Sequence, residues 1–457
     1  MPEVTEVKPA TFREVFAQSE YRAVYAASAL SWIGDYITKA AVTVLVYHQT
    51  ESVALSAASF AVSYLPWLVG GPFLATLAER RPYRSVMVAC DLVRMCLVLV
   101  LAYPGLPVGV MLAVLFALTL ANPPSQAARS ALLPLILIGD RLVVGLSLQI
   151  STGQAAQVVG YVTGATIAAA NPRAALLVDA MTFAASALLI RFGVRHRPPA
   201  IADEQRRHLL RETAEGFSLV FGAPVLRAIA IIVFTSMLFA IVPEGLAAAW
   251  AAEEAETEAQ RGAAQALIMA ANPVGFMLGG LLVGRLVRPD VRRALIRPFA
   301  VVAPLTLVPA LLDPPPSVVA LLAASCGFAI AGMMPAANAL FVQCLPNGFR
   351  ARAFGVMASG TQVIQGVAVL ATGLLADTLS LPIPLVVGLW SIAGVVLVAA
   401  AASVWPNSSQ IDAAIEQAAR QNAEPPQQTG GAADAGSTSE AGTEPRPSPS
   451  QTSAATG

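Results

Sequence analysis

Residues 22–47 read RAVYAASALSWIGDYITKAAVTVLVY, an apolar stretch in which Asp35 and Lys39 are the charged residues between its ends. About 20 mainly apolar residues in a helix cross the roughly 30 Å hydrocarbon core of a bilayer, with every backbone group hydrogen-bonded inside the helix. The stretch therefore predicts a membrane-spanning helix that holds an acid, Asp35, close to its midpoint.

Composition extends this interpretation to the whole chain. Of its 457 residues, 56% are hydrophobic and 12% are charged, whereas soluble domains carry about 25% charged residues. Twelve segments have spanning length: 22–47, 53–77, 86–103, 108–128, 142–170, 174–192, 225–250, 263–284, 294–312, 317–345, 353–376 and 383–405. The predicted fold class is an all-α integral membrane protein with twelve transmembrane helices, and a soluble globular protein is excluded.

The turns between these segments predict the orientation. Arginine marks cytoplasmic loops, and the even-numbered turns carry most of the loop arginines, whereas the opposite turns carry only Arg173 and Arg261. Both termini are therefore expected in the cytoplasm.

Three segments lie outside the predicted spans. Residues 1–21 form a cytoplasmic N-terminal segment. Residues 193–224 are basic and amphipathic, which is typical of a linker that rests on the inner membrane surface. Residues 406–457 are too polar as a whole to bury a core, so they are expected to be a disordered cytoplasmic tail.

An internal repeat divides the spans into two six-helix bundles, 22–192 and 225–405. Ala75-Thr-Leu-Ala-Glu79-Arg80 after the second span is matched by Gly280-Leu-Leu-Val-Gly284-Arg285 after the eighth. Prolines and paired glutamines recur at nearly the same offset, which indicates duplication. The bundles are expected to be pseudo-symmetric, with spans 1, 4, 7 and 10 lining a central cavity.

Several function classes are excluded or disfavoured. The formal net charge is zero, so the chain lacks the basic field that nucleic-acid binding requires. Its two lysines, Lys8 and Lys39, lie in no GxxxxGK[ST] loop, which argues against nucleotide hydrolysis. Neither a convergent Ser/His/Asp set nor metal-ligand spacing is present, so we expect no enzyme activity, no metal and no cofactor.

The motifs resemble one family. Leu30-Ser-Trp-Ile-Gly34-Asp35, Leu77-Ala-Glu79-Arg80-Arg81-Pro82-Tyr83-Arg84 and Arg129-Ser-Ala-Leu-Leu-Pro134 are similar to motifs of the major facilitator superfamily. The similarity is strongest to its bacterial drug and siderophore exporter branch, and the chain looks enterobactin-exporter-like over about residues 12–405. The resemblance implies the twelve-helix fold and export. Gly160-Tyr161-Val-Thr-Gly164 lacks the proline of the antiporter pattern in span 5, which keeps import open.

Asp35 is the first candidate for proton coupling. A carboxyl group inside the membrane is costly and marks a functional position by default, and a group that gains and loses a proton in two conformations can link proton entry to substrate movement. Lys39 lies one turn further on the same face, so it could be a static charge partner of Asp35 or extend away and leave Asp35 unpaired. Glu244 is the second coupling candidate, with a carboxylate in the outer vestibule as the alternative.

A second group of charges is expected to hold the inner gate. Its members are Glu79, Arg80, Arg84, Asp91, Arg94 and Arg129, which lie near three span ends. The resemblance implies that this region latches the two bundles together when the cavity faces outward. A purely architectural latch or a determinant of topology is an equal alternative.

Neutral side chains supply candidates for the cavity wall: Trp32, Tyr64, Gln154, Gln157, Gln362 and Gln365. The glutamine pairs share a helix face and suit either helix–helix bonding or a polyspecific cavity. The aromatic residues suit either core packing or substrate stacking.

The sequence thus predicts a secondary active transporter that exports a small amphipathic compound, such as an antibiotic, drug or siderophore, in exchange for protons or another cation. The alternatives are an importer, a facilitator for a lipid-like substrate, and a receptor or scaffold without transport. We expect a monomer surrounded by lipid in the plasma membrane, that is, a bacterial inner membrane.

Overall fold

The computed structural model describes residues 11–67, 81–197, 209–346 and 349–423. Every regular element in these ranges is helical, which confirms the all-α class. The helices are α1 (Phe12–Ala17), α2 (Ser19–Thr50), α3 (Val53–Val62), α5 (Tyr83–Leu101), α6 (Val108–Leu120), α7 (Asn122–Ile136), α8 (Asp140–Ala170), α9 (Pro172–Gly193), α10 (Leu209–Gly222), α11 (Pro224–Ala240), α12 (Val242–Glu254), α13 (Glu258–Leu286), α14 (Pro289–Ala294), α15 (Ile296–Leu305), the 3₁₀ helix η1 (Val308–Leu312), α16 (Pro316–Gln343), α17 (Arg350–Leu379), α18 (Ile383–Ser403) and α19 (Ser408–Ala423).

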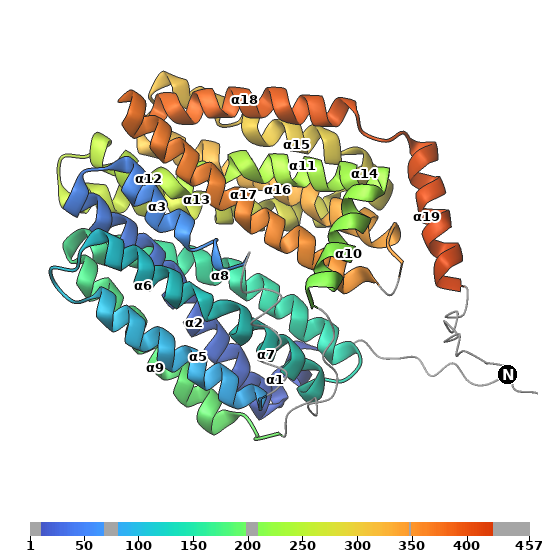
Figure 1. The fold of residues 1–457 in the computed structure, drawn as a ribbon, viewed down its shortest axis with the longest axis horizontal. Helices are drawn as coiled ribbons and strands as arrows, with labels where there is room; N and C mark the ends of the chain where they lie inside the picture. The colour runs from blue at the N-terminus through green and yellow to red at the C-terminus, as the bar shows by residue number, and fades with distance from the viewer. Residues whose placement is uncertain (1–10, 68–80, 198–208, 347–348, 424–457) are drawn as a thin grey trace, which may run out of the picture.

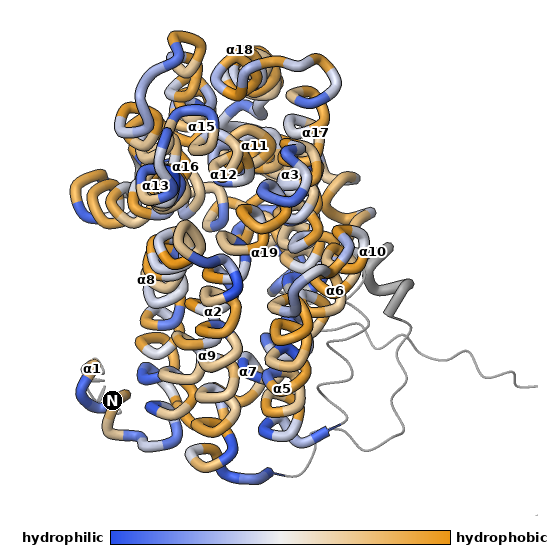
Figure 2. Tube along the Cα trace, turned by 90° about the vertical axis from the view of Figure 1, so that its left-hand side faces the viewer, coloured by the Kyte–Doolittle hydropathy of each residue, from blue (hydrophilic) through white to orange (hydrophobic). Residues whose placement is uncertain are grey.

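Nine helical stretches in the described ranges are long and apolar enough to cross a membrane. They are α2, α6 with α7, α8, α9, α11 with α12, α13, α16, α17 and α18. Figure 2 shows hydrophobic residues along most of their lengths and hydrophilic residues at many of the turns. The chain is therefore a multi-pass membrane protein. Helices α3, α5 and α15 lie on the remaining three predicted segments, and the count of twelve spans stays a prediction.

Prolines explain why two predicted spans are interrupted helices. Helix α6 ends at Leu120, and Pro123 and Pro124 lie in the first turn of α7. Helix α11 ends at Ala240, and Pro243 is the second residue of α12. Proline cannot donate the hydrogen bond that a helix interior needs, so it stands where one helix ends and the next begins.

The helices lie in two groups (Figure 1). In one, α2 packs against α8 and α9, and α5 packs against α6, α7 and α9; in the other, α16 packs against α13 and α15, and α18 against α11 and α15. The groups meet where α8 packs on α13 and where α3 packs on α17. Small residues allow the close approach: a Cβ on Gly262 of α13 would lie 2.3 Å from that of Ala169 in α8. Pseudo-symmetry between the groups stays a prediction.

One end of the molecule is closed by contacts between the two groups. Asp377, near the end of α17, accepts hydrogen bonds from the backbone N–H groups of Val53 (2.9 Å) and Ala54 (3.0 Å) and from the Ser52 hydroxyl. His48 and Glu258 lie 3.8 Å apart at the same end. A carboxylate from one group thus caps the first turn of α3, where a negative charge is stabilised by the helix dipole.

The prediction of a disordered tail over residues 406–457 is wrong for its first part, because residues 408–423 form α19. Asn407 accepts from the backbone N–H of Gln410 (2.9 Å) and Gln410 accepts from that of Asn407 (3.1 Å), which is a capping box. Ile411 and Ala418 are buried on one face of the helix, which rests on α11 and α16. Averaging the composition of the whole tail concealed this short amphipathic pattern. Residues 424–457 lie outside the described residues.

The predicted linker contains one described helix, α10. Gly216 lies directly against Arg352 of α17, and Arg352 donates to Glu215 at 2.7 Å. The C-terminal part of the linker is therefore attached to the second group of helices.

Candidate functional site

A cavity of about 160 Å³ lies beside the middle of α2. Trp32, Asp35, Tyr36 and Lys39 line it because residues three, four and seven apart share one helix face. Helices α5, α6 and α7 and residue Trp67 complete most of the wall, and Gln362 of α17 is the contribution from the second group. Spans 1 and 4 line this cavity as predicted, whereas spans 7 and 10 do not.

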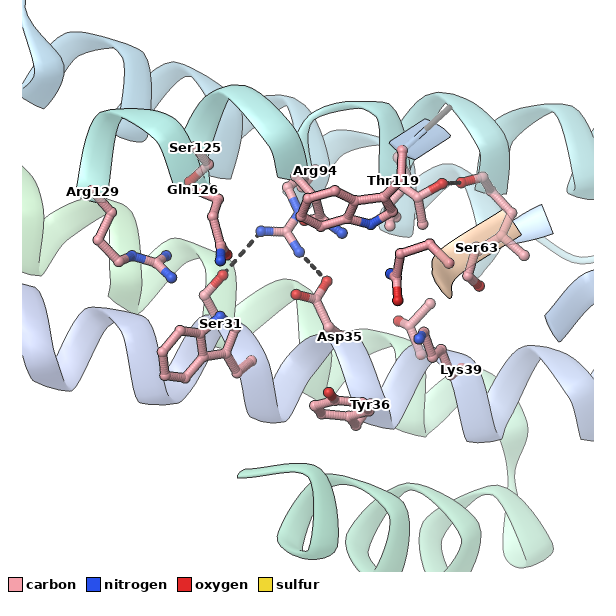
Figure 3. Close-up of a pocket in the computed structure, with 17 residues that line it drawn as sticks. Ser31, Asp35, Tyr36, Lys39, Ser63, Arg94, Thr119, Ser125, Gln126 and Arg129 are labelled. Atoms are coloured by element: carbon pink, nitrogen blue, oxygen red, sulfur yellow. Dashed lines mark hydrogen bonds and ion pairs between the residues drawn. The ribbon is translucent and has the colours of Figure 1, made fainter. Parts of the chain in front are cut away.

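The carboxylate of Asp35 forms an ion pair with the guanidinium of Arg94 (Figure 3). Arg94 also donates to the hydroxyl of Ser31 at 2.9 Å, and its guanidinium carbon lies 4.2 Å from the centre of the Phe183 ring. Only 1% of Arg94 is exposed, whereas 17% of the Asp35 side chain is exposed in the cavity wall, so the arginine side of the pair is buried. Breaking a buried pair by removing one partner costs about 3–5 kcal/mol, which makes its protonation state a strong influence on conformation.

Two further acids surround this pair without lining the cavity. Asp91 lies 3.8 Å from Arg94 and accepts from the hydroxyl of Ser186 at 2.6 Å. Asp179 is fully buried and accepts from Thr38 and, at 3.1 Å, from Thr182. Hydroxyl groups bond both carboxylate oxygens of Asp179 but only one of Asp91, whose Oδ1 is buried without a hydrogen-bond partner in the described structure.

Sequence reasoning offered Lys39 as the charge partner of Asp35, but the structure gives Asp35 a different partner. Among the described residues, Lys39 has no carboxylate within ion-pair distance. Its ammonium group lies 4.6 Å from the ring centre of Tyr64, 5.4 Å from that of Tyr36 and 5.6 Å from that of Phe60. Aromatic rings attract a cation that is shielded from water. Tyr64, a predicted cavity residue, thus contributes to the surroundings of Lys39.

Glu244, the second coupling candidate, is 3% exposed and joins the two groups of helices. It accepts from the hydroxyl of Tyr161 at 3.1 Å and from the amide of Gln157 at 3.4 Å, both on α8. Tyr161 in turn packs edge-on against Tyr36, with ring centres 5.0 Å apart. This buried connection differs from the vestibule alternative.

The residues predicted to form an inner gate are only partly brought together. Glu79 and Arg80 lie outside the described residues, and Arg84 lies in the first turn of α5. Arg94 pairs with Asp35 at the middle of α2 rather than at a helix end. Arg129 is also in the cavity wall, with its guanidinium carbon 5.0 Å from the centre of the Trp32 ring. Arg94 is the twelfth of the 19 residues of α5, so it lies past the midpoint of that helix rather than near its inner end.

The three other predicted glutamines have different surroundings. Gln362 lines the cavity, Gln365 contacts the sulfur of Met237 at 3.6 Å, and Gln154 is half-buried on α8 and does not line the cavity.

Asp179, Ser31 and Thr38 belong to the network but were not among the predicted residues. Asp179 is an isolated acid inside span 6, which is the same signal that identified Asp35. The hydroxyl residues carry no comparable signal, because serine and threonine are common in spanning helices.

No group of three His, Cys, Asp or Glu side chains that could hold a metal ion occurs within the described part of the chain.

No family model matches the chain. Macrolide efflux protein A of Streptococcus pyogenes is 25% identical over 156 residues. The match covers 33% of this chain, and the chain spans only 37% of the length of that curated relative.

Solved structures share the fold over most of the chain. The nucleoside transporter NupG superposes with a TM-score of 0.69 at 15% identity, covering 85% of this chain and 100% of that chain. A POT family transporter gives 0.64 at 12% identity, over 83% and 94% of the two chains. A bacterial homologue of the iron transporter ferroportin gives 0.59 at 15% identity, over 86% and 100%.

The chain therefore shares its overall fold with these solved transporter structures over most of its length.

Proposed function

We propose that this chain is a proton-coupled secondary transporter that exports a small amphipathic compound across the plasma membrane, in a bacterium the inner membrane. The proposed topology has twelve spans in two six-helix bundles, 22–192 and 225–405, with both termini in the cytoplasm. The proposal rests mainly on one observation, the Asp35–Arg94 ion pair in the wall of a cavity beside the middle of a spanning helix.

The pair suggests how a proton acts. Ionised Asp35 holds Arg94 against α2, whereas protonated Asp35 loses most of the Coulomb attraction that fixes this contact. Arg94 then retains Asp91, 3.8 Å away on its own helix, as its acid. A proton on Asp35 therefore weakens the link between α2 and α5, and the two protonation states favour different arrangements of the helices.

Export is supported by the partial match to a protein named for macrolide efflux. The closed end, formed by Ser52, Asp377, His48 and Glu258, is the outer end if the arginine-rich turns are cytoplasmic. The described conformation is then one in which a substrate reaches the cavity from the cytoplasm.

Reconstituted vesicles test this function. With an acidic lumen and the cytoplasmic face outward, the protein should concentrate a macrolide, a catechol siderophore or another amphipathic compound inside, and a protonophore should abolish the accumulation. Equilibration of the compound without accumulation would identify a facilitator. Accumulation only under the reversed proton gradient would identify an importer. No movement of any compound would favour a receptor or scaffold.

A further inference from the structure

The cavity wall contains more basic than acidic side chains. Three basic residues line it, Lys39, Arg94 and Arg129, against one acid, Asp35. The other buried acids, Asp91, Asp179 and Glu244, are not in its wall. They accept hydrogen bonds from Ser186, from Thr38 and Thr182, and from Tyr161 and Gln157, respectively. Arg94 is neutralised by Asp35, so two cations remain available to a bound molecule.

Arg129 is the stronger of the two as a binding group. It is 5% exposed, and it has no ion pair with any residue that the structure describes. Its Nε is buried without a hydrogen-bond partner in the described structure. A buried donor without a partner costs free energy, and a buried unpaired charge costs more. An anionic ligand would remove both costs.

The surroundings of Arg129 suit an anion with an apolar part. Figure 3 shows its side chain reaching from α7 toward Ser31 on α2, with Ser125 and Gln126 beside it. Trp32 lies under the guanidinium, and Trp67 is also in the wall. Neutral hydroxyl and amide groups add hydrogen bonds to an anionic head, while the indole rings offer apolar surface.

Lys39 adds a second positive charge at the other end of the cavity. It lies two turns beyond Trp32 on α2, about 10 Å along the axis at 1.5 Å per residue. The distance suits a second polar group of an extended ligand.

We propose that the cavity binds an amphipathic organic anion, whose carboxylate is held by Arg129 and whose apolar part lies against Trp32. This names the substrate class and rests on the proposed transport function, since it assigns the cavity to the substrate. The chemistry favours an anion over a cation, because an organic cation would meet the two cations, Lys39 and Arg129, that no acid in the wall neutralises.

Three probes of nearly equal shape test the sign of the ligand: 1-naphthylacetate, 1-naphthylacetamide and 1-naphthylethylamine. Binding to the full chain in detergent is followed by quenching of tryptophan fluorescence, without any proton gradient, so failed coupling cannot be mistaken for failed anion selectivity. The carboxylate should bind at least about tenfold more tightly than the amide, because a hydrogen bond to a charged group in a dry site contributes about one decade of affinity or more. The amine should bind most weakly.

Variants assign the selectivity to Arg129. Arg129→Gln should bring the carboxylate and the amide to within about threefold of each other, whereas Arg420→Gln, on the exposed face of α19, should leave the tenfold preference unchanged. Arg129→Lys keeps the charge and serves if the glutamine variant does not fold; it should lower the preference without removing it. The proposal would be overturned if the unmodified protein bound the carboxylate and the amide equally, bound the amine more tightly, or bound no probe. It would also be overturned if the preference were unchanged in Arg129→Gln or Arg129→Lys.

Discussion

Gly34 sets how closely α9 approaches α2, and thereby where the buried acids lie. A Cβ at this position would stand 2.0 Å from a carboxylate oxygen of Asp179 and 2.2 Å from the hydroxyl of Thr182. Gly34 directly precedes Asp35 on α2. Asp179 of α9 occupies the space that the absent side chain of Gly34 leaves. The glycine of the Trp-Ile-Gly-Asp motif is therefore a packing requirement of the charged network.

Gly34→Ala should lower the stability of the purified protein by about 1–3 kcal/mol, the usual cost of overpacking a filled interior. Thermal unfolding in detergent would measure it. Gly280→Ala is the matched control, because nothing lies within 4 Å of its added Cβ; it should be neutral or stabilising by about 0.5–1 kcal/mol. Equal midpoints for the two variants would show that α9 yields without cost.

The residue scale also shows the limit of the sequence. Asp35 and Glu244 could be predicted because an isolated acid in an apolar stretch needs an explanation. The partner of Asp35 could not, because Lys39 is near in sequence whereas Arg94 comes near only through the packing of α5 against α2. Local spacing favoured the wrong cation.

At the scale of elements, the junction of α3 with α17 holds one end of the molecule closed. Asp377 caps α3 with two backbone hydrogen bonds and one from Ser52. Hydrogen bonds to a charged group contribute about 1.5–3 kcal/mol each, net of the exchange with water. Alternating access requires this cap to break.

Asp377→Ala should raise the population open at this end by about tenfold or more, since about 1.4 kcal/mol corresponds to one decade. Tyr103, just after α5, and Leu312, the last residue of η1, are exposed at that end on opposite groups. Spin labels at these two positions would report the longer distance in a background without the native cysteines. The control Glu416→Ala, on the exposed face of α19, should not change the distance distribution. An unchanged distribution in Asp377→Ala would remove the latch from the account.

Helix α19 shows that the average composition of a long polar segment does not predict a short helix within it. Ile411, Ala414, Ile415 and Ala418 recur at helical spacing and face the second group of helices, but they are few within a long polar tail. Arg293 and Asp412 add a contact of 3.5 Å between exposed side chains, which contributes little by itself.

Ile411→Asp should release α19, because the packed face cannot accept an unpaired charge. Limited proteolysis would then cut after Arg420 about tenfold faster, as expected from losing roughly 1.5–3 kcal/mol of apolar burial. Gln417→Asp adds the same charge on the exposed face and should be cut at the original rate. Equal rates for both variants would mean that α19 is not held by Ile411.

At the scale of the whole molecule, hydropathy alone predicted the class and the approximate position of the spans, because a bilayer imposes length and polarity on every segment that crosses it. The closed end was not predictable, since Ser52 and Asp377 carry no signal until α3 and α17 are packed together. The cavity is built almost wholly from the first group of helices, with Gln362 from the second. A sequence repeat predicts equal contributions, but the side chains of the two halves differ.

The central claim is that Asp35 couples protons to substrate movement, and Asp35→Asn tests it most directly in reconstituted vesicles. Asparagine keeps the size and the hydrogen-bonding atoms but cannot change its charge, and Arg94 retains Asp91 as an acid. The variant should bind and equilibrate substrate at close to the unmodified rate and lose accumulation under a proton gradient, whereas Asp412→Asn, exposed on α19, should accumulate normally. A folded Asp35→Asn protein that still concentrates substrate would contradict the account and make Glu244 the next residue to test.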